Sequence, residues 1–112
     1  MTQEDKELLL KDLCARLPYG VKVYNEPYVF DLDNFEVIST ITETIIEVIE
    51  EGWKPYLRPM SSMTEEERFN FQSLAFVNDA IMIFDWLHSH HFDCRGLIPK
   101  GLALEAPKGM YN

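Results

Sequence analysis

The residues with the greatest chemical potential lie in the last third of the chain. His88, His90 and His91 are followed closely by Asp93 and Cys94. Imidazole, carboxylate and thiolate groups are the usual protein ligands of zinc, and His88 and His91 would share one helix face at a spacing of three residues. The sequence therefore offers a candidate metal site made of His88, His91, Asp93 and Cys94.

The same segment contains a candidate nucleophile. A neighbouring imidazolium lowers the pKa of a thiol, so Cys94 with one of the histidines is a candidate centre for a small thiol-dependent enzyme. A catalytic pair also needs an oxyanion hole and a substrate cleft, and the sequence indicates neither. It also contains no phosphate-cradling glycine loop and no nucleophile elbow.

A structural interpretation of this segment competes with both. The spacing matches no standard zinc pattern, and adjacent histidines on a helix point about 100° apart. A histidine near a helix C-terminus can cap exposed carbonyl groups, Asp93 to Arg95 can form a local ion pair or turn, and a buried or half-buried Cys94 is the default for a free thiol. We therefore expect no cofactor and no enzymatic activity, and the metal- or thiol-dependent enzyme is the alternative.

The element that begins the chain is expected to be a helix from Thr2 to Leu17. Thr2 and Asp5 have the spacing of a capping box, and apolar residues recur at helical spacing up to Leu17, where Pro18 follows. This helix would have one apolar stripe and a charged back made of Glu4, Lys6, Glu7, Lys11 and Asp12, so its apolar side must pack on another element.

The central part of the chain has the pattern of an antiparallel meander. Short runs rich in Val, Ile, Thr, Tyr and Phe alternate with turn residues. We expect a small curved sheet or SH3-like barrel of about five strands. The strands are placed near Val21 to Tyr24, Tyr28 to Leu32, Glu36 to Ile41, Thr44 to Ile49 and Trp53 to Leu57. The run from Thr44 to Ile49 also fits one face of a short helix, and its β-branched residues favour a strand.

A long helix and a docked tail complete the predicted α+β domain. Thr64 followed by three glutamates indicates a helix start, and the apolar pattern continues to about His90 with a break near Ser73 or Asn78. The wide apolar arc is typical of a central helix that is flanked on more than one side. Gly and Pro residues then stop the helix, and the end of the chain after Pro107 is expected to fray. With 112 residues, we expect one domain over residues 1–112.

The charge of the chain limits its partners. Nineteen acidic and ten basic residues give a formal net charge of −9, which disfavours direct binding to nucleic acids or anionic membranes. No Lys or Arg lies between Lys22 and Lys54, where acidic residues are dense. This region is either a solvated face or a docking surface for a basic partner, with Glu43, Glu47 and Glu50 as its candidate contacts.

A second candidate interface lies at the last predicted strand. Trp53, Tyr56 and Arg58 are of the types enriched in interfaces, and Pro55 and Pro59 predict an edge strand that leaves the sheet. Such an edge could pair with a partner strand or with a second copy, giving a structural homo-oligomer. The alternative is that this segment attaches the sheet to the long helix.

Location follows from the same composition. The start of the chain is acidic and lacks the layout of a secretory signal, and no apolar run has membrane-spanning length. We expect a cytoplasmic protein in which Cys14 and Cys94 are reduced.

Three blocks of sequence carry a resemblance to a family. They are LPYG at residues 17–20, KPYLRPMSSMT at residues 54–64 and HHFDCRGLIPKGLALEAP at residues 90–107. In these blocks the chain resembles a family of small proteins encoded by gut Bacteroidetes and their phages. Members of this family often have Tyr at the place of Cys94, which argues against an essential thiol.

The resemblance implies a phage or mobile-element setting and supplies no activity or binding residue. Combined with the charge, it leads us to expect a non-enzymatic protein–protein interaction module. In its most specific form the chain is an acidic decoy that occupies a basic, nucleic-acid-binding surface of a bacterial or phage protein.

Overall fold

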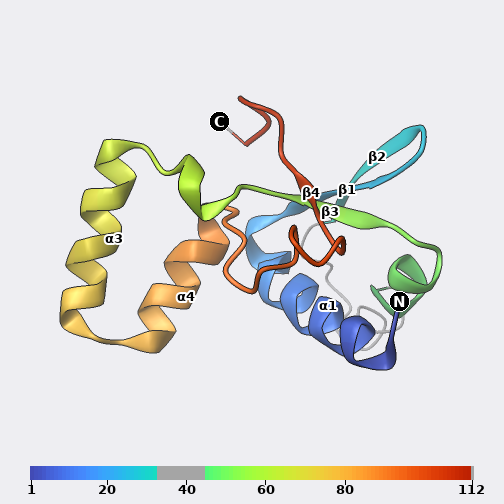
Figure 1. Ribbon diagram of the computed structural model, residues 1–112, viewed down its shortest axis with the longest axis horizontal. Helices are drawn as coiled ribbons and strands as arrows, with labels where there is room; N and C mark the ends of the chain where they lie inside the picture. Colours follow the sequence, from blue (N-terminus) through green and yellow to red (C-terminus); the bar gives the residue numbers. More distant parts are fainter. Residues whose placement is uncertain (33–44, 112) are drawn as a thin grey trace.

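The computed structural model describes residues 1–32 and 45–111. It confirms the predicted α+β class, with helices around a four-stranded mixed sheet. Figure 1 shows α1 against one side of the sheet, and α3 and α4 as a pair of helices that extends away from this body. Among the described residues, no helix combines the length and apolar character needed to cross a membrane.

Helix α1 (Gln3–Arg16) begins and ends where the sequence predicts. The Thr2 hydroxyl accepts the Asp5 N–H at 3.0 Å, and the Asp5 carboxylate accepts the Thr2 N–H at 3.2 Å, which completes the capping box. A 3-10 turn, η1 (Leu17–Tyr19), ends at Gly20 with a φ of 76°, a conformation that glycine adopts at no steric cost. Leu9 and Leu13 are fully buried and fix the helix on the core.

The sheet has the strand order β2-β1-β3-β4. Its strands are β1 (Val21–Asn25), β2 (Tyr28–Leu32), β3 (Lys54–Leu57) and β4 (Leu104–Glu105). Strand β1 pairs antiparallel with β2 and with β3, whereas β3 pairs parallel with β4. The sheet is therefore mixed, and the pairings described do not close it into a barrel.

Strand β3 corrects the prediction of an exposed edge. It lies inside the sheet, between β1 and β4, because the segment around Leu104 returns to pair with Tyr56. The Ala106 N–H donates to the Leu57 carbonyl at 2.8 Å and extends this contact. Pro55 pairs with Val23 and is almost fully buried, so the missing N–H of proline does not place this strand at the edge.

The predicted strand from Thr44 to Ile49 is wrong, because residues 45–50 are helical. Ile45 and Ile49 are 0% and 4% exposed, and their spacing of four places both on one helix face toward the core. Burial of this face outweighs the strand propensity of the β-branched residues. The strand predicted from Glu36 to Ile41 lies outside the described residues.

The predicted long helix is divided in two at Asn78, one of the two break points expected. Helix α3 (Glu65–Val77) ends at Asn78 with a φ of 61°, and the Asp79 carboxylate accepts the N–H groups of Ile81 and Met82 to start α4 (Ala80–Ser89). At the start of α3, Thr64 and Glu67 form the predicted capping box.

The expectation that this region is central is wrong. No residue of α3 is buried, and the pair α3–α4, called here the helical hairpin, projects from the body (Figure 1). The apolar residues that predict burial are therefore exposed on the surface of the protein.

The chain end docks on the body, as predicted for the tail, but it does not fray after Pro107. The Tyr111 hydroxyl donates to the Tyr56 carbonyl at 2.7 Å and accepts the Lys22 N–H at 2.9 Å. These bonds hold the end of the chain across β1 and β3.

Candidate functional site

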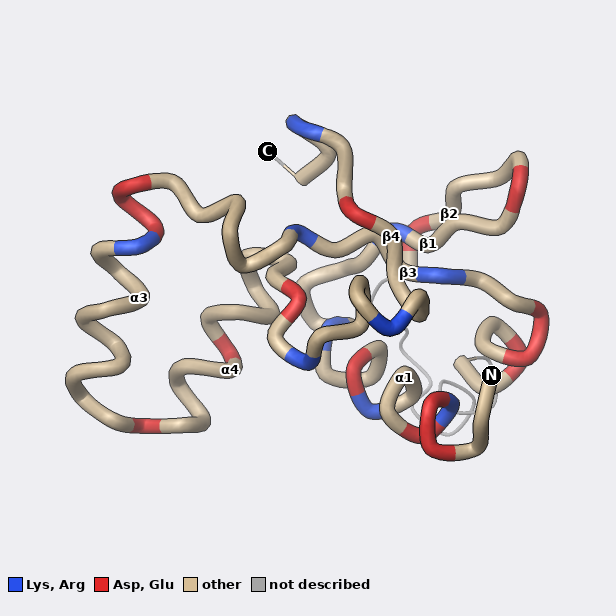
Figure 2. Tube along the Cα trace, in the orientation of Figure 1, with Lys and Arg blue, Asp and Glu red and all other residues tan. Residues whose placement is uncertain are grey.

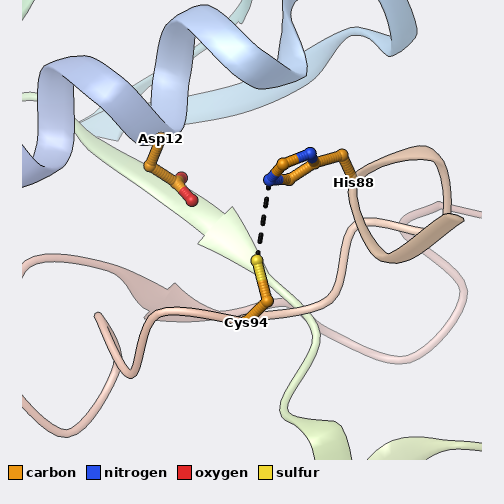
Figure 3. A group of neighbouring side chains, drawn as sticks. All are labelled: Asp12, His88 and Cys94. Carbon is orange, nitrogen blue, oxygen red and sulfur yellow. Dashed lines mark hydrogen bonds between the residues drawn. The ribbon is translucent and has the colours of Figure 1, made fainter. Parts of the chain in front are cut away.

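A buried polar cluster joins α1 to the segment that follows α4. It consists of Asp12, Arg16, His88, Cys94 and Arg95 and is called here the Asp12 cluster. Figure 3 shows Asp12 on α1, His88 on α4 and Cys94 on the following loop, with their side chains directed toward one another. The cluster thus brings together three parts of the chain that are far apart in sequence.

Asp12 is the anionic centre of the cluster. It is fully buried, and Arg16, also fully buried, donates from Nε at 2.8 Å and from Nη2 at 3.0 Å to its two oxygens. Arg95 donates from Nη1 to Asp12 Oδ1 at 2.8 Å. One carboxylate therefore faces two guanidinium groups, and the cluster carries one excess positive charge.

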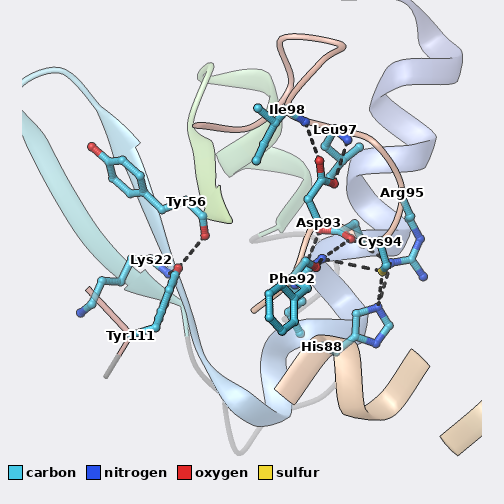
Figure 4. A network of polar contacts seen from close by, with 12 residues as sticks. Lys22, Tyr56, His88, Phe92, Asp93, Cys94, Arg95, Leu97, Ile98 and Tyr111 are labelled. Atoms are coloured by element: carbon cyan, nitrogen blue, oxygen red, sulfur yellow. Dashed lines mark hydrogen bonds and ion pairs between the residues drawn. The ribbon is translucent and has the colours of Figure 1, made fainter. Parts of the chain in front are cut away.

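His88 and Cys94 are close but not activated. The Cys94 Sγ lies 3.6 Å from His88 Nε2, as Figures 3 and 4 show. Burial, together with the charges of Arg16 and Arg95, lowers the pKa of His88 to about 4, and burial raises the pKa of the Cys94 thiol. At neutral pH both groups are uncharged, so the arrangement does not stabilise the thiolate–imidazolium pair that a cysteine nucleophile needs.

Three metal-ligand types also meet in the cluster. One ligand atom each of Asp12, His88 and Cys94 lies within 4.8 Å of the others. However, Arg95 Nη1 lies 2.9 Å from His88 Nε2 and 3.6 Å from Cys94 Sγ, while it also binds Asp12. A guanidinium group thus already makes the contacts that a metal ion would make, and a second cation there would be repelled.

The predicted metal ligands are only partly brought together. His88 and Cys94 meet, but the His91 ring stacks on Tyr111 with a centroid distance of 3.8 Å. Asp93 accepts the N–H groups of Leu97 at 2.8 Å and Ile98 at 3.0 Å, as Figure 4 shows. The interpretation of Asp93 as a turn residue is therefore right, and an ion pair with Arg95 is not formed.

Sequence reasoning missed Asp12, Arg16 and Arg95. The signal for the first two was present, because Asp12 and Arg16 are spaced by four residues within the arc that also contains Leu9 and Leu13. The sequence predicts a charged back for this helix, but Asp12 lies on the buried face instead.

His90 confirms the expected capping role of a histidine. Its Nδ1 lies 3.0 Å from the Trp86 carbonyl at the end of α4, and its ring stacks on the Trp86 ring at 4.2 Å. His90 therefore ends the helix rather than contributing to the Asp12 cluster.

The residues predicted as an acidic docking surface are spread out. Glu43 lies outside the described residues, Glu47 is exposed, and Glu50 accepts from Lys6 Nζ at 3.1 Å. Figure 2 shows acidic and basic residues interspersed along α1 and its surroundings. The described residues here do not form an unbroken acidic face.

The residues predicted around the strand edge mainly support the fold. Arg58 donates to both carboxylate oxygens of Glu67, at 2.7 and 2.8 Å, and its guanidinium lies 4.2 Å from the Phe92 ring centroid. The Arg58 contact lowers the pKa of Glu67 to about 2. Tyr56 is held by Tyr111, and the Trp53 Nε1 donates to a neighbouring glutamate. The interpretation that this segment attaches the sheet to the helices fits these contacts.

An unexpected surface lies on the helical hairpin. Phe76 is 92% exposed, Ile81 is 83%, Phe69 is 70% and Val77 is 63%. Asp79 is the only charged residue between Phe69 and Phe84, and Figure 2 shows the other charged residues of the hairpin at the start of α3 and on α4. Sequence reasoning identified this apolar pattern but assigned it to the core.

Comparisons with models of protein families, with curated proteins and with solved structures found no match. The function is therefore inferred from the geometry of this chain.

Proposed function

We propose that this chain is a non-enzymatic protein–protein interaction module whose helical hairpin inserts into an apolar pocket of a partner protein. The exposure of Phe69, Phe76, Val77 and Ile81 carries this proposal. Large exposed apolar patches mark interaction sites in proteins, and the hairpin presents apolar residues on two of its sides.

The exposed area is close to what an interface needs. At about 200 Å² for a whole aromatic side chain, the exposed parts of Phe69, Phe76 and Phe84 provide about 400 Å². The aliphatic residues Val77 and Ile81, with Met82, add roughly 200 Å² at the burial values typical of such side chains. The total of about 600 Å² approaches the roughly 800 Å² that each partner contributes to a standard interface.

The distribution of this area favours a concave partner over a second copy. Phe69 and Phe76 line a shallow hollow on α3, whereas Ile81 and Phe84 face a different groove, beside α1. A flat contact between two α3 faces would bury only about 600 to 700 Å² in total, which is below the roughly 1,000 Å² expected of a stable interface. A pocket that encloses the hairpin would cover both faces.

The charge of the chain adds a second property of the partner. The hairpin carries five acidic residues and one arginine, a net −4 of the chain's −9, and most of these charges lie at the start of α3 rather than among the exposed apolar residues. A basic rim around the apolar pocket would attract the acidic body and speed association. A cytoplasmic bacterial or phage protein with such a rim is the partner we propose, which retains the basic surface of the decoy hypothesis.

The test compares capture by the wild-type chain and by Phe76→Asp. Capture is performed from a bacterial lysate at low salt and at about 0.5 M salt, and each retained protein is then purified and titrated against both chains. We expect binding to weaken by about 30-fold or more in Phe76→Asp, because a charged group would enter a desolvated pocket.

Tyr28→Asp is the matched control. Tyr28 is 68% exposed on β2, far from the hairpin, and the substitution makes the same change of an exposed aromatic residue into an acid. Equal loss in both variants, or no loss in Phe76→Asp, would contradict the proposed surface. Light scattering that shows a wild-type dimer and a Phe76→Asp monomer would instead identify a homo-oligomer.

A further inference from the structure

A groove separates α1 from α4 and has a volume of about 580 Å³. This volume is in the range of small-molecule sites, roughly 300 to 1,000 Å³. Ala15, Ala80, Ile81 and Phe84 form apolar parts of its lining, and it is called here the α1–α4 groove. The helical hairpin thus has one side that already belongs to a cavity within the same chain.

The polar end of the groove is formed by members of the Asp12 cluster. Arg95, His88 and Cys94 line it, and the Arg95 side chain is 15% exposed. Asp12 and Phe84 fix Arg95 from two sides, because Nη1 binds the carboxylate at 2.8 Å and the guanidinium carbon lies 5.9 Å from the Phe84 ring centroid. The guanidinium is therefore held in place at the groove.

Arg95 still has donors available. Its Nε and Nη2 have no hydrogen-bond partner among the residues that the structure describes, and neither atom is buried. These two nitrogens form one edge of the guanidinium fork, which matches the two oxygens of a carboxylate. The edge opposite the Asp12 contact is thus ready for an anion.

The charges around the fork also favour an anion. Arg16 and Arg95 together exceed the single charge of Asp12, and Arg16 Nη1 is buried without a partner among the described residues. His88 and Cys94 are uncharged at neutral pH and cannot balance this excess. At the rim, Lys11 and Asp85 offset each other, and Asp85 accepts a hydrogen bond from the Tyr19 hydroxyl.

We propose that the α1–α4 groove binds a carboxylic acid with an apolar body, whose carboxylate pairs with the Nε and Nη2 edge of Arg95 while the body packs on Ile81 and Phe84. A hydrophilic anion such as phosphate would gain nothing from the apolar lining, and an organic cation would meet the excess positive charge. The carboxylate could belong to a free acid or to the last residue of an apolar peptide. The groove shares Ile81 and Phe84 with the hairpin surface, so a partner that covers both faces would compete with the acid, but binding of the acid does not require that partner.

Decanoate is the probe, added to the full-length chain and followed by the backbone amide shifts in NMR. We expect saturable binding at about 1 mM or below, with the largest shifts near Ala15, Ile81 and Arg95. Decanol lacks the charge and acetate lacks the body, so each should bind at least about tenfold more weakly. Equal binding of decanol and decanoate, or no saturable binding of decanoate, would overturn the inference.

Variants separate recognition from folding. Arg95→Gln should weaken decanoate binding by at least about tenfold, and Arg68→Gln, the same change at an exposed residue of α3, should leave it unchanged. Because Arg95→Gln also removes a contact to Asp12, Lys11→Gln and Phe84→Ala provide tests at groove residues outside that contact, and each should weaken binding. Unchanged decanoate binding in Phe84→Ala would also overturn the site. So would NMR shifts centred on Lys6, which lines a different hollow of the protein.

Two further arms of the experiment identify the source of the carboxylate and separate this test from the test of the hairpin partner. The peptide Leu-Phe-Leu with a free carboxyl end should bind more tightly than decanoate if a protein terminus is the ligand, and its amide should not bind. Tighter binding of decanoate would identify a free acid. Phe76→Asp should retain decanoate binding, so a failure of the hairpin proposal leaves this test unaffected.

Discussion

Replacing Asp12 by Asn tests whether the buried cluster holds α1 against the segment that follows α4. Asp12 is fully buried and accepts three hydrogen bonds from Arg16 and Arg95. Asn keeps the shape and removes the charge, which leaves two guanidinium groups without an anion. Breaking a buried pair in this way costs about 3 to 5 kcal/mol.

Asp31→Asn is a control that makes the same substitution in an exposed ion pair. The Asp31 carboxylate binds Lys22 Nζ at 2.7 Å, but its side chain is 68% exposed. A surface pair of this kind contributes about 0 to 1 kcal/mol. The two substitutions therefore make the same chemical change at sites that differ in burial and in the number of hydrogen bonds.

Urea denaturation followed by tryptophan fluorescence measures both variants. The free energy of unfolding should fall by about 3 to 5 kcal/mol in Asp12→Asn and by less than about 1 kcal/mol in Asp31→Asn, with an unchanged slope. In a thermal scan, the larger loss corresponds to roughly 12 to 20 °C in Tm for a chain of this size. Similar losses in the two variants would refute the view that Asp12 is the buried anion that offsets the charges of Arg16 and Arg95.

Two other predictions concern His88 and Cys94. Since the pKa of His88 is lowered to about 4 in the folded protein, the unfolded chain binds the extra proton first as pH falls below 6.5. The free energy of unfolding should therefore decrease between pH 6.5 and 4, by up to about 3 kcal/mol from this group, and His88→Gln should reduce that pH dependence in urea denaturation. Since burial raises the pKa of Cys94, its alkylation by iodoacetamide at pH 7 should be slow and should not slow further in His88→Ala. A fast reaction that His88→Ala abolishes would instead support the thiol-dependent enzyme.

Local signals in the sequence predicted the ends of the helices well. The capping residues Thr2 and Thr64 act through hydrogen bonds within one turn, so their effect is independent of the rest of the fold. Asn78 similarly ends α3 through its own left-handed conformation. Such features can be read from sequence because the interacting groups are neighbours along the chain.

Features that depend on distant segments were harder to predict. Strand β3 lies inside the sheet because Leu104 and Glu105 pair with it. These two residues are too few to give a recognisable strand pattern in the sequence. Residues 45–50 contain signals for both a strand and a helix, and tertiary burial of Ile45 and Ile49 selects the helix. In both cases the deciding contact lies outside the local pattern.

The candidate site illustrates a different limit. His88 and Cys94 were recognisable as reactive types, but both are uncharged at neutral pH mainly because they are buried, and this burial depends on the packing of α1 and α4, which the sequence does not show. An apolar helix pattern likewise predicts burial without stating what covers it. Phe76 belongs to this apolar pattern, and its exposure follows from the way the hairpin leaves the body.

The parallel pairing of β3 with β4 has a consequence for the folding process. One edge of β3 pairs with β1, and the opposite edge has open N–H and C=O groups until Leu104 and Glu105 pair with it. A contact between segments so distant in sequence forms slowly, because a long loop must close before the pairing contributes stability. An unpaired edge of β3 is open to pairing with another chain, so the contact with β4 also protects this strand against aggregation.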